Sequence, residues 1–232
     1  MRRACSECGV RDQALCASLT DEQLAVLSRS GRRQYVAKGE SVIWAGDENM
    51  ICANVVAGVF KLSTSTADGR EQIVGLLYPA DFLGRPYAPS SHYTVDALTD
   101  AELCVFPRMH FEQALHDYDE LERLLLQRTL AELDNTRDWM LLLGRKTAEE
   151  KVASFILQMS RRLAKGRCAA STAEEFLLPL SRTQVADVLG LTIETVSRQM
   201  TRLKNAGVID LPTTRSIRVL NMAALSACAE HD

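Results

Sequence analysis

The stretch LSRTQVADVLGLTIETVSRQMTRL, residues 180–203, decides the fold of the C-terminal part of the chain. It predicts two short helices that meet at Gly190, because glycine readily adopts the left-handed conformation that ends a helix. Thr192 is suited to cap the second helix. Small Ala186 is expected where the helices cross, and the predicted shared core comprises Val185, Leu189, Leu191, Val196 and Leu203. The pattern indicates a helix-turn-helix.

Polar residues three, four or eight positions apart share the outer face of the second helix, namely Glu194, Ser197, Arg198 and Arg202. Arg198 has the donor fork that fits guanine, and Glu194 can accept from the cytosine amino group. Residues 209–219 predict a β-hairpin wing. The alternative is a pair of amphipathic helices whose charges are only solvated. Turn, cap, charge and wing agree with one another, so we favour a reader of the DNA major groove.

Local charge also points to DNA. The segment Ser181–Leu220 has six basic and three acidic residues, whereas the whole chain has a net charge of −3, which leaves about −6 on the remainder. A basic module on an acidic body fits a partner with phosphates at that end only. Further candidate DNA contacts are Thr192, Arg182, Lys204 and Arg215, of which we expect Lys204 and Arg215 to meet phosphate.

The 232 residues suffice for one large domain or two modest ones, and 47% apolar with 25% charged residues is ordinary for a globular protein. No stretch approaches the roughly 20 apolar residues that span a bilayer. The start of the chain lacks the apolar core of a signal peptide, so we expect a cytoplasmic protein. In that compartment seven cysteines favour metal binding or redox chemistry over a disulfide framework.

Between Arg32 and Pro107 the pattern changes to short strands separated by glycines, including 41–44, 53–56, 59–62 and 72–76. Asp68-Gly69 between two such runs predicts a hairpin. Many short strands at this spacing predict a small β-barrel or roll. A helix capped by Thr20 or Asp21 is expected before them.

Pro107 opens a helical region, and nothing interrupts a helix from Asp119 to Leu143. A coiled-coil seam that predicts a homodimer follows a 4-3-4-3 spacing through Leu126, Leu130, Leu133, Arg137 and Met140. Arg137 either weakens this seam, as suits a marginal dimer, or reaches solvent or an aspartate beside it. After this helix we expect a hinge at 144–147, a second helix at 148–164 and a loop at 166–172.

The predicted fold is therefore α+β. Its parts are a cysteine-rich segment (1–18), a cupin-like β-roll (19–110), a dimerisation helix region (111–145) and a winged helix-turn-helix domain (146–232).

Cys5, Cys8 and Cys16 form a Cys-x2-Cys-x7-Cys pattern. Thiolates at this spacing suit an iron–sulfur cluster or zinc, and a fourth ligand is needed. Cys104 lies in the predicted strand 101–106 and faces away from its two apolar neighbours. The alternative for Cys104 is a small buried apolar residue. We accept that reading for the other cysteines, Cys52, Cys168 and Cys228.

The order of these parts resembles the CRP/FNR family of transcription regulators, in which the β-roll is a cyclic-nucleotide-binding-type domain. The stretch LGLTIETVSR (189–198) is similar to the FNR signature, whereas WMLLLGRKTA (139–148) and VGLLYPADFLGRP (74–86) resemble its FnrL branch. The resemblance covers nearly the whole chain. It implies that the protein regulates transcription and is not an enzyme.

The resemblance implies that Cys5, Cys8, Cys16 and Cys104 hold a 4Fe-4S cluster, although the spacer between Cys8 and Cys16 departs from the best-known members. With little oxygen the dimer is then expected to bind inverted half-sites similar to TTGAT, and oxygen to release it. The resemblance also implies that a hairpin contacts RNA polymerase and can activate transcription, through Asp68, Gly69, Arg70 and Glu71.

A cyclic nucleotide is disfavoured, because Arg85 stands where nucleotide-binding relatives have a glutamate and Ser91-His92 lies near where they have the phosphate-binding arginine. A CRP-like regulator that senses a small molecule or zinc remains the alternative. A redox enzyme would need a second cysteine pair or a dinucleotide loop, and neither is found in the sequence.

Overall fold

The computed structural model describes residues 5–163 and 174–230, so the predicted loop at 166–172 lies outside the described residues. The chain divides into two compact units, Met1–Asp134 and Asn135–Asp232. Helix α3 (Asp119–Arg145) begins in the first unit and ends in the second, close to its predicted bounds. Among the described helices, none combines the length and the apolar character that crossing a membrane requires.

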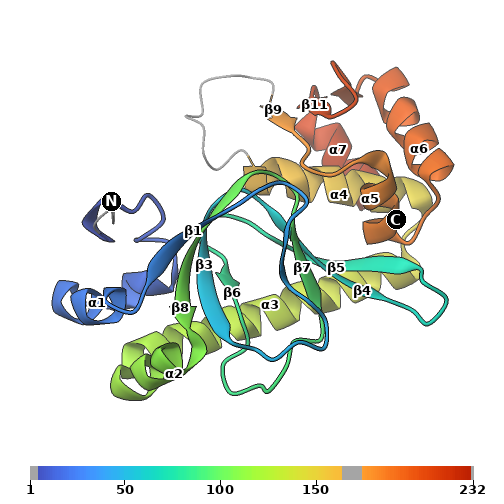
Figure 1. Ribbon diagram of the computed structural model, residues 1–232. Coiled ribbons are helices and arrows are strands. Elements are labelled where there is room, and N and C mark those ends of the chain that lie inside the picture. The colour runs from blue at the N-terminus through green and yellow to red at the C-terminus, as the bar shows by residue number, and fades with distance from the viewer. Residues whose placement is uncertain (1–4, 164–173, 231–232) are drawn as a thin grey trace. The chain divides into compact units, whose positions relative to one another are not determined.

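Two four-stranded antiparallel sheets form most of the first unit, in the orders β1-β8-β3-β6 and β2-β7-β4-β5 (Figure 1). Their strands are β1 (Arg32–Val36), β2 (Ser41–Ile43), β3 (Ile51–Ala57), β4 (Phe60–Ser65), β5 (Glu71–Leu77), β6 (Phe82–Leu83), β7 (Thr94–Ala97) and β8 (Ala101–Pro107). Fully buried side chains such as Val55, Phe60 and Leu103 fill one core cluster of this unit. The predicted β-roll is confirmed.

Two glycines set turns of the roll. Gly69 has φ +83° in the hairpin between β4 and β5, where the Thr66 N–H donates to the Arg70 carbonyl at 3.0 Å, which confirms the predicted hairpin. Gly58, between β3 and β4, has φ +86°, and a Cβ there would lie 2.5 Å from the Ala101 Cβ. Only glycine fits at position 58, because both the conformation and the close approach exclude a side chain.

Strand β8 separates two apolar clusters. Leu103 and Val105 are buried in the core of the roll, whereas Cys104 packs against a second cluster that contains Leu15, Phe106 and further apolar residues. The prediction that Cys104 faces away from Leu103 and Val105 is confirmed. The alternation of side chains along a strand therefore brings a cysteine to the outer face of the sheet.

The second cluster is built from the N-terminal segment and three helices, α1 (Asp21–Ser28), α2 (Arg108–Asp117) and the start of α3. Single 3₁₀ turns, Cys5–Glu7 and Leu15–Ser18, hold two of the N-terminal cysteines. Thr20 caps α1 in a reciprocal capping box with Gln23, so of the two predicted candidates, Thr20 and Asp21, it is Thr20 that caps the helix. Leu15 and Leu121, 1% and 0% exposed, tie the N-terminal segment and α3 to this cluster.

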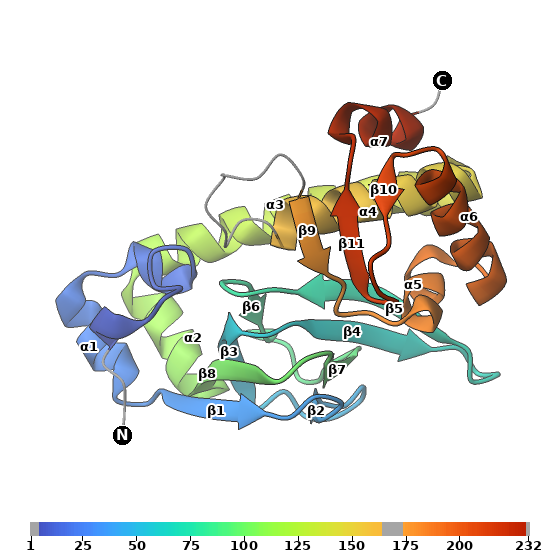
Figure 2. The ribbon, with the colours of Figure 1, turned by 90° about the horizontal axis from the view of Figure 1, so that it is seen from above.

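The second unit contains α4 (Ala148–Leu163), α5 (Arg182–Leu189), α6 (Ile193–Asn205) and α7 (Met222–Ala229). Its sheet has the order β10-β11-β9, formed by β10 (Ile209–Asp210), β11 (Ser216–Val219) and β9 (Glu174–Leu177), which lie side by side in Figure 2. The predicted wing is confirmed as the β10–β11 hairpin. The sequence analysis did not predict β9 or α7.

Candidate functional site

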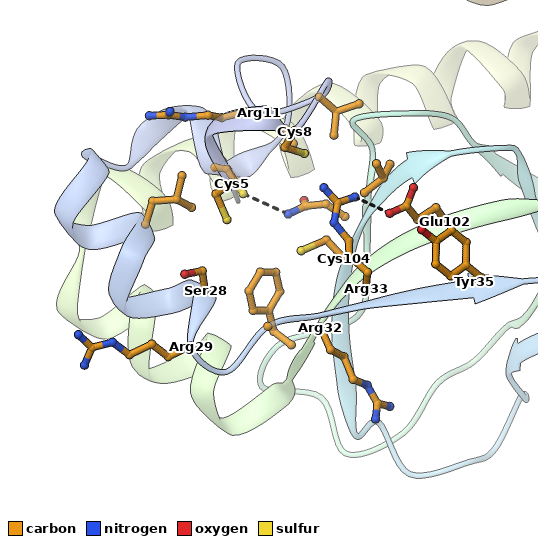
Figure 3. Close-up of a pocket in the computed structure, with 18 residues that line it drawn as sticks. Cys5, Cys8, Arg11, Ser28, Arg29, Arg32, Arg33, Tyr35, Glu102 and Cys104 are labelled. Atoms are coloured by element: carbon orange, nitrogen blue, oxygen red, sulfur yellow. Dashed lines mark hydrogen bonds and ion pairs between the residues drawn. The ribbon is translucent and has the colours of Figure 1, made fainter. Parts of the chain in front are cut away.

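A cavity of about 530 Å³ opens on the outer face of β8 and is lined by four cysteines, Cys5, Cys8, Cys16 and Cys104 (Figure 3). Three of them come from the N-terminal segment and the fourth from the sheet. The structure thus brings together the four cysteines that the sequence analysis singled out. Among the described residues, no three Cys, His, Asp or Glu side chains are grouped closely enough to hold a single metal ion.

Two of the four thiols, those of Cys16 and Cys104, have a raised pKa. Burial, followed by the nearby Cys5 and Cys8, raises the pKa of Cys16 to about 11. Burial and then the nearby Cys16 raise the pKa of Cys104 to about 12. The cysteines therefore share one electrostatic environment, in which a bound cation would be needed to stabilise several thiolates together.

Two polar residues that sequence reasoning missed also line the cavity, Arg33 on β1 and Asn54 on β3. Arg33 Nη1 lies 3.1 Å from Glu102 Oε1 in a largely buried ion pair. Asn54 is 2% exposed, and its Nδ2 donates to the Cys16 sulfur at 3.6 Å. The signal for Asn54 was present in the sequence, since it interrupts the otherwise apolar strand ICANVVA.

The other two described cysteines lie elsewhere. Cys52 is fully buried, does not line the cavity, and has a pKa raised to about 12 by burial. Cys228 lies on α7 in the second unit, and Cys168 lies outside the described residues.

A second cavity, beside Gly84, Arg85 and Ser91, occupies the region where a cyclic nucleotide was considered. Its volume is about 80 Å³, whereas pockets for small-molecule ligands are roughly 300–1,000 Å³. Asn49 donates to the Arg85 carbonyl, and a Cβ at Gly84 would come within 3.0 Å of the Cys52 backbone. Arg85 and Ser91, on which the sequence argument about a nucleotide rests, thus line a small cavity.

Helices α5 and α6 form the predicted helix-turn-helix. Ser181 caps α5 in a capping box with Gln184, Gly190 ends it in the left-handed conformation (φ +60°), and Thr192 caps α6. Four of the five predicted core residues are buried, and Leu191 is partly exposed. Local sequence signals therefore account for both ends of α5 and for the start of α6.

The exposed face of α6 carries Glu194, Ser197, Arg198 and Arg202. Hydrogen bonds from the backbone and then from Thr192 hold the pKa of the Glu194 carboxyl below its usual value. Glu194 is therefore an acceptor near neutral pH, as contact with a cytosine amino group requires. Arg202 is engaged in an ion pair with Glu149 of α4 at 2.9 Å.

The other predicted DNA contacts differ in their surroundings. Lys204 is paired with Asp210 at 3.3 Å, whereas Arg215 is exposed in the turn of the wing. Arg182 is half-buried, burial lowers its pKa, and its Nη1 is without a hydrogen-bond partner among the described residues. Thr192 has the capping role already described.

Helix α3 exposes apolar side chains at the predicted seam positions. Leu126, Leu130 and Leu133 are 57%, 52% and 44% exposed. Further along the same helix Met140 is 70% exposed, and Arg137 is also exposed. Exposed apolar residues in a row on one helix are typical of a surface that another chain covers.

The hairpin residues Asp68, Gly69, Arg70 and Glu71 are all exposed. Asp68 and Arg70 form an ion pair of 2.8 Å across the turn, and Glu71 pairs with Lys61 of β4. The turn is therefore shaped by its own contacts and leaves both charged side chains of its tip open to solvent.

Two family models match the chain. Residues 33–118 match the cyclic nucleotide-binding domain, and residues 150–228 match the Crp-like helix-turn-helix domain. A probable transcriptional activator of Rhizobium leguminosarum bv. viciae is 46% identical over 96% of this chain and 91% of its own length. The transcriptional activator protein FnrL of Cereibacter sphaeroides is 44% identical over 95% of this chain and 90% of its own length.

Among solved structures, FixK2 from Bradyrhizobium japonicum superposes with a TM-score of 0.79 at 32% identity, covering 87% of this chain and 98% of that one. The matches span both the β-roll and the helix-turn-helix. These relatives are regulators of transcription, and the chain is a DNA-binding transcription regulator that belongs to the CRP/FNR family.

Proposed function

We propose that this regulator senses oxygen through a 4Fe-4S cluster held by Cys5, Cys8, Cys16 and Cys104. The observation that carries the proposal is the single cavity that all four side chains line. Four cysteine thiolates are the ligand set that such a cluster requires. The compartment we propose is the cytoplasm, where thiols are kept reduced and free to bind metal.

The size of the cavity supports a cluster over zinc. A structural zinc site draws four ligands to about 2.3 Å from one ion and is closed. The cavity of about 530 Å³, which the four cysteines line together with other residues, has room for a larger group. When bound, a 4Fe-4S cluster supplies a redox centre that oxygen can destroy, which removes the link between the N-terminal segment and β8.

Contacts of α3 connect the cysteine segment to the helix of the proposed dimer seam. Arg128 of α3 donates to the backbone carbonyl of Gln13, in the spacer between Cys8 and Cys16. Leu15 and Leu121 belong to the same apolar cluster. A shift of the cysteine segment therefore acts directly on the helix that carries the exposed seam, and we propose that the cluster biases a homodimer formed along Leu126, Leu130, Leu133, Arg137 and Met140.

On DNA, we propose that Glu194, Ser197 and Arg198 meet base edges in half-sites similar to TTGAT. A two-fold dimer would place the two copies of α6 roughly 34 Å apart, in successive major grooves. Contacts to the DNA backbone, or at the margin of the base contacts, are then made by Thr192, Arg182, Arg202, Lys204 and Arg215. The exposed hairpin 68–71 is the proposed contact with RNA polymerase, through which the protein activates transcription.

The test is the iron and sulfide content of protein purified without oxygen. We expect a brown wild-type protein whose chromophore is lost as completely in Cys104→Ala as in Cys8→Ala, because the cluster needs four thiolates. Cys228→Ala is the control and should retain the chromophore. Full iron and sulfide in Cys104→Ala would contradict the ligand assignment. Zinc without iron in the wild type would favour the alternative, a CRP-like regulator that senses zinc or a small molecule.

A further inference from the structure

The strand register places two polar residues directly beside Cys104. On one side Arg33 of β1 is paired with Cys104 of β8, and on the other side Asn54 of β3 is paired with the same residue. Directly paired residues of neighbouring antiparallel strands project from the same face of a sheet. Arg33, Cys104 and Asn54 therefore form one row across three strands, at the floor of the cysteine-lined cavity.

The Asn54 side chain is buried and the Arg33 side chain is half-buried, and both lie beside cysteines of the cavity. The Arg33 side chain is 19% exposed, and its Nη1 lies 3.1 Å from Glu102 Oε1, so an ion pair holds the guanidinium at the cavity. Asn54 donates from Nδ2 to the Cys16 sulfur at 3.6 Å, whereas its Oδ1, which can only accept, is buried without a hydrogen-bond partner in the part of the chain that the structure describes. A buried amide that already donates to a cysteine sulfur is placed to support that sulfur when it is a metal ligand.

We propose that Arg33 and Asn54 are positioning residues for the bound iron–sulfur cluster, donating to its sulfur ligands from the two strands that flank Cys104. The inference rests on the cluster proposed above. Four thiolates bring more negative charge than the core of the cluster offsets, and the half-buried guanidinium of Arg33 compensates for part of it. Figure 3 shows Arg33 beside Cys104, with its guanidinium linked to Glu102.

The same geometry gives the sign of the effect on the reduction potential. A nearby positive charge favours the more negatively charged, reduced form of a redox centre, and hydrogen bonds to sulfur act in the same direction. Arg33 therefore raises the potential. Glu102 carries the opposite charge at the same place and lowers it.

The experiment compares Arg33→Gln with Arg32→Gln in full-length protein loaded anaerobically. Arg32 is the matched control, because it is the adjacent arginine of β1 but is exposed and extends away from Cys104 (Figure 3). We expect Arg33→Gln to bind iron and sulfide roughly 10–100-fold more weakly, the usual effect of removing a residue that supports metal ligands. Its midpoint potential, measured with mediator dyes, should fall, and Arg33→Lys should restore part of the shift.

A second variant separates this role from a structural one. Glu102→Gln should raise the potential, whereas simple damage to the site would move both variants in the same direction. Asn54→Leu should lower the potential, as Arg33→Gln does. If Arg33→Gln does not fold because Glu102 has lost its ion-pair partner, the double variant Arg33→Gln/Glu102→Gln is used instead. Its midpoint potential is then compared with that of the Glu102→Gln single variant.

The outcomes distinguish this inference from the proposed function. A wild-type protein that takes up no cluster contradicts both. A wild-type protein with a full cluster, together with Arg33→Gln and Arg32→Gln variants of equal potential and equal iron content, supports the proposed function and overturns the role of Arg33.

Discussion

Arg198→Ala tests which residue reads sequence. Arg198 lies on the exposed face of α6, and within the described residues it makes no ion pair. Its guanidinium fork is therefore available without breaking an existing contact. Lys204 offers the comparison, because it is already paired with Asp210 at 3.3 Å and is expected to meet only phosphate.

The size of the effect follows from the number of half-sites. Loss of one bidentate contact to guanine costs about 1–3 kcal/mol, so a dimer on two half-sites should lose about 2–6 kcal/mol. That corresponds to roughly 30-fold to 20,000-fold weaker binding to the operator. Lys204→Ala should instead weaken all sequences alike and flatten the salt dependence by at most about one unit per half-site, because DNA must compete with Asp210 for this lysine.

The assay is fluorescence anisotropy with anaerobic protein on an inverted repeat of TTGAT half-sites, on single-base variants and on scrambled DNA, each over a range of salt. Arg198→Ala should lose discrimination at one base pair of each half-site while scrambled DNA binds nearly as before. If affinity falls equally for operator and scrambled DNA, Arg198 is a phosphate contact and the assigned register of α6 on the bases is wrong.

Three further predictions concern the dimer, the roll and the hairpin. Leu130→Asp, at a position that is 52% exposed, should convert the anaerobic dimer to monomer in sedimentation, and an unchanged dimer would exclude this face of α3. Gly58→Ala should lower the midpoint of thermal unfolding by more than the control Gly69→Ala does. Both glycines have positive φ, but only at position 58 would the new Cβ meet another residue, Ala101. Equal shifts of the midpoint would show that the roll relaxes around the contact. Arg70→Ala should reduce transcription from an activated promoter without changing DNA affinity, and full activity would leave the hairpin an ordinary solvated turn.

The sequence predicted features whose causes are local. The left-handed residue at Gly190, the caps at Thr20 and Thr192 and the hairpin at Asp68-Gly69 each depend on a few adjacent residues, and all are confirmed. The side of the sheet on which Cys104 lies follows from alternation alone.

What the sequence could not provide is information on pairing between distant segments. The role of Arg33 depends on the register of β1 on β8, and the role of Asn54 depends on the register of β3 on β8. Neither register can be read from one amino-acid sequence. Strand β9 was missed for the same reason, because four residues become a strand only by pairing with β11. Helix α7 is a short run of small and apolar residues whose apolar positions do not repeat with the helical period, so the hydrophobic pattern did not predict a helix there.

The four cysteines of the cavity differ in how firmly their surroundings hold them. Cys104 is held between two hydrogen-bonded strands, and Cys16 follows two residues, Ala14 and Leu15, that are each 1% exposed. Cys5 and Cys8 are half-buried and belong to a short turn that is closed by the Cys8 N–H donating to the Cys5 carbonyl at 3.2 Å. Two of the four proposed cluster ligands are thus fixed by buried surroundings and two belong to a short turn, so we expect loading of the proposed cluster to depend chiefly on the first two cysteines of the chain.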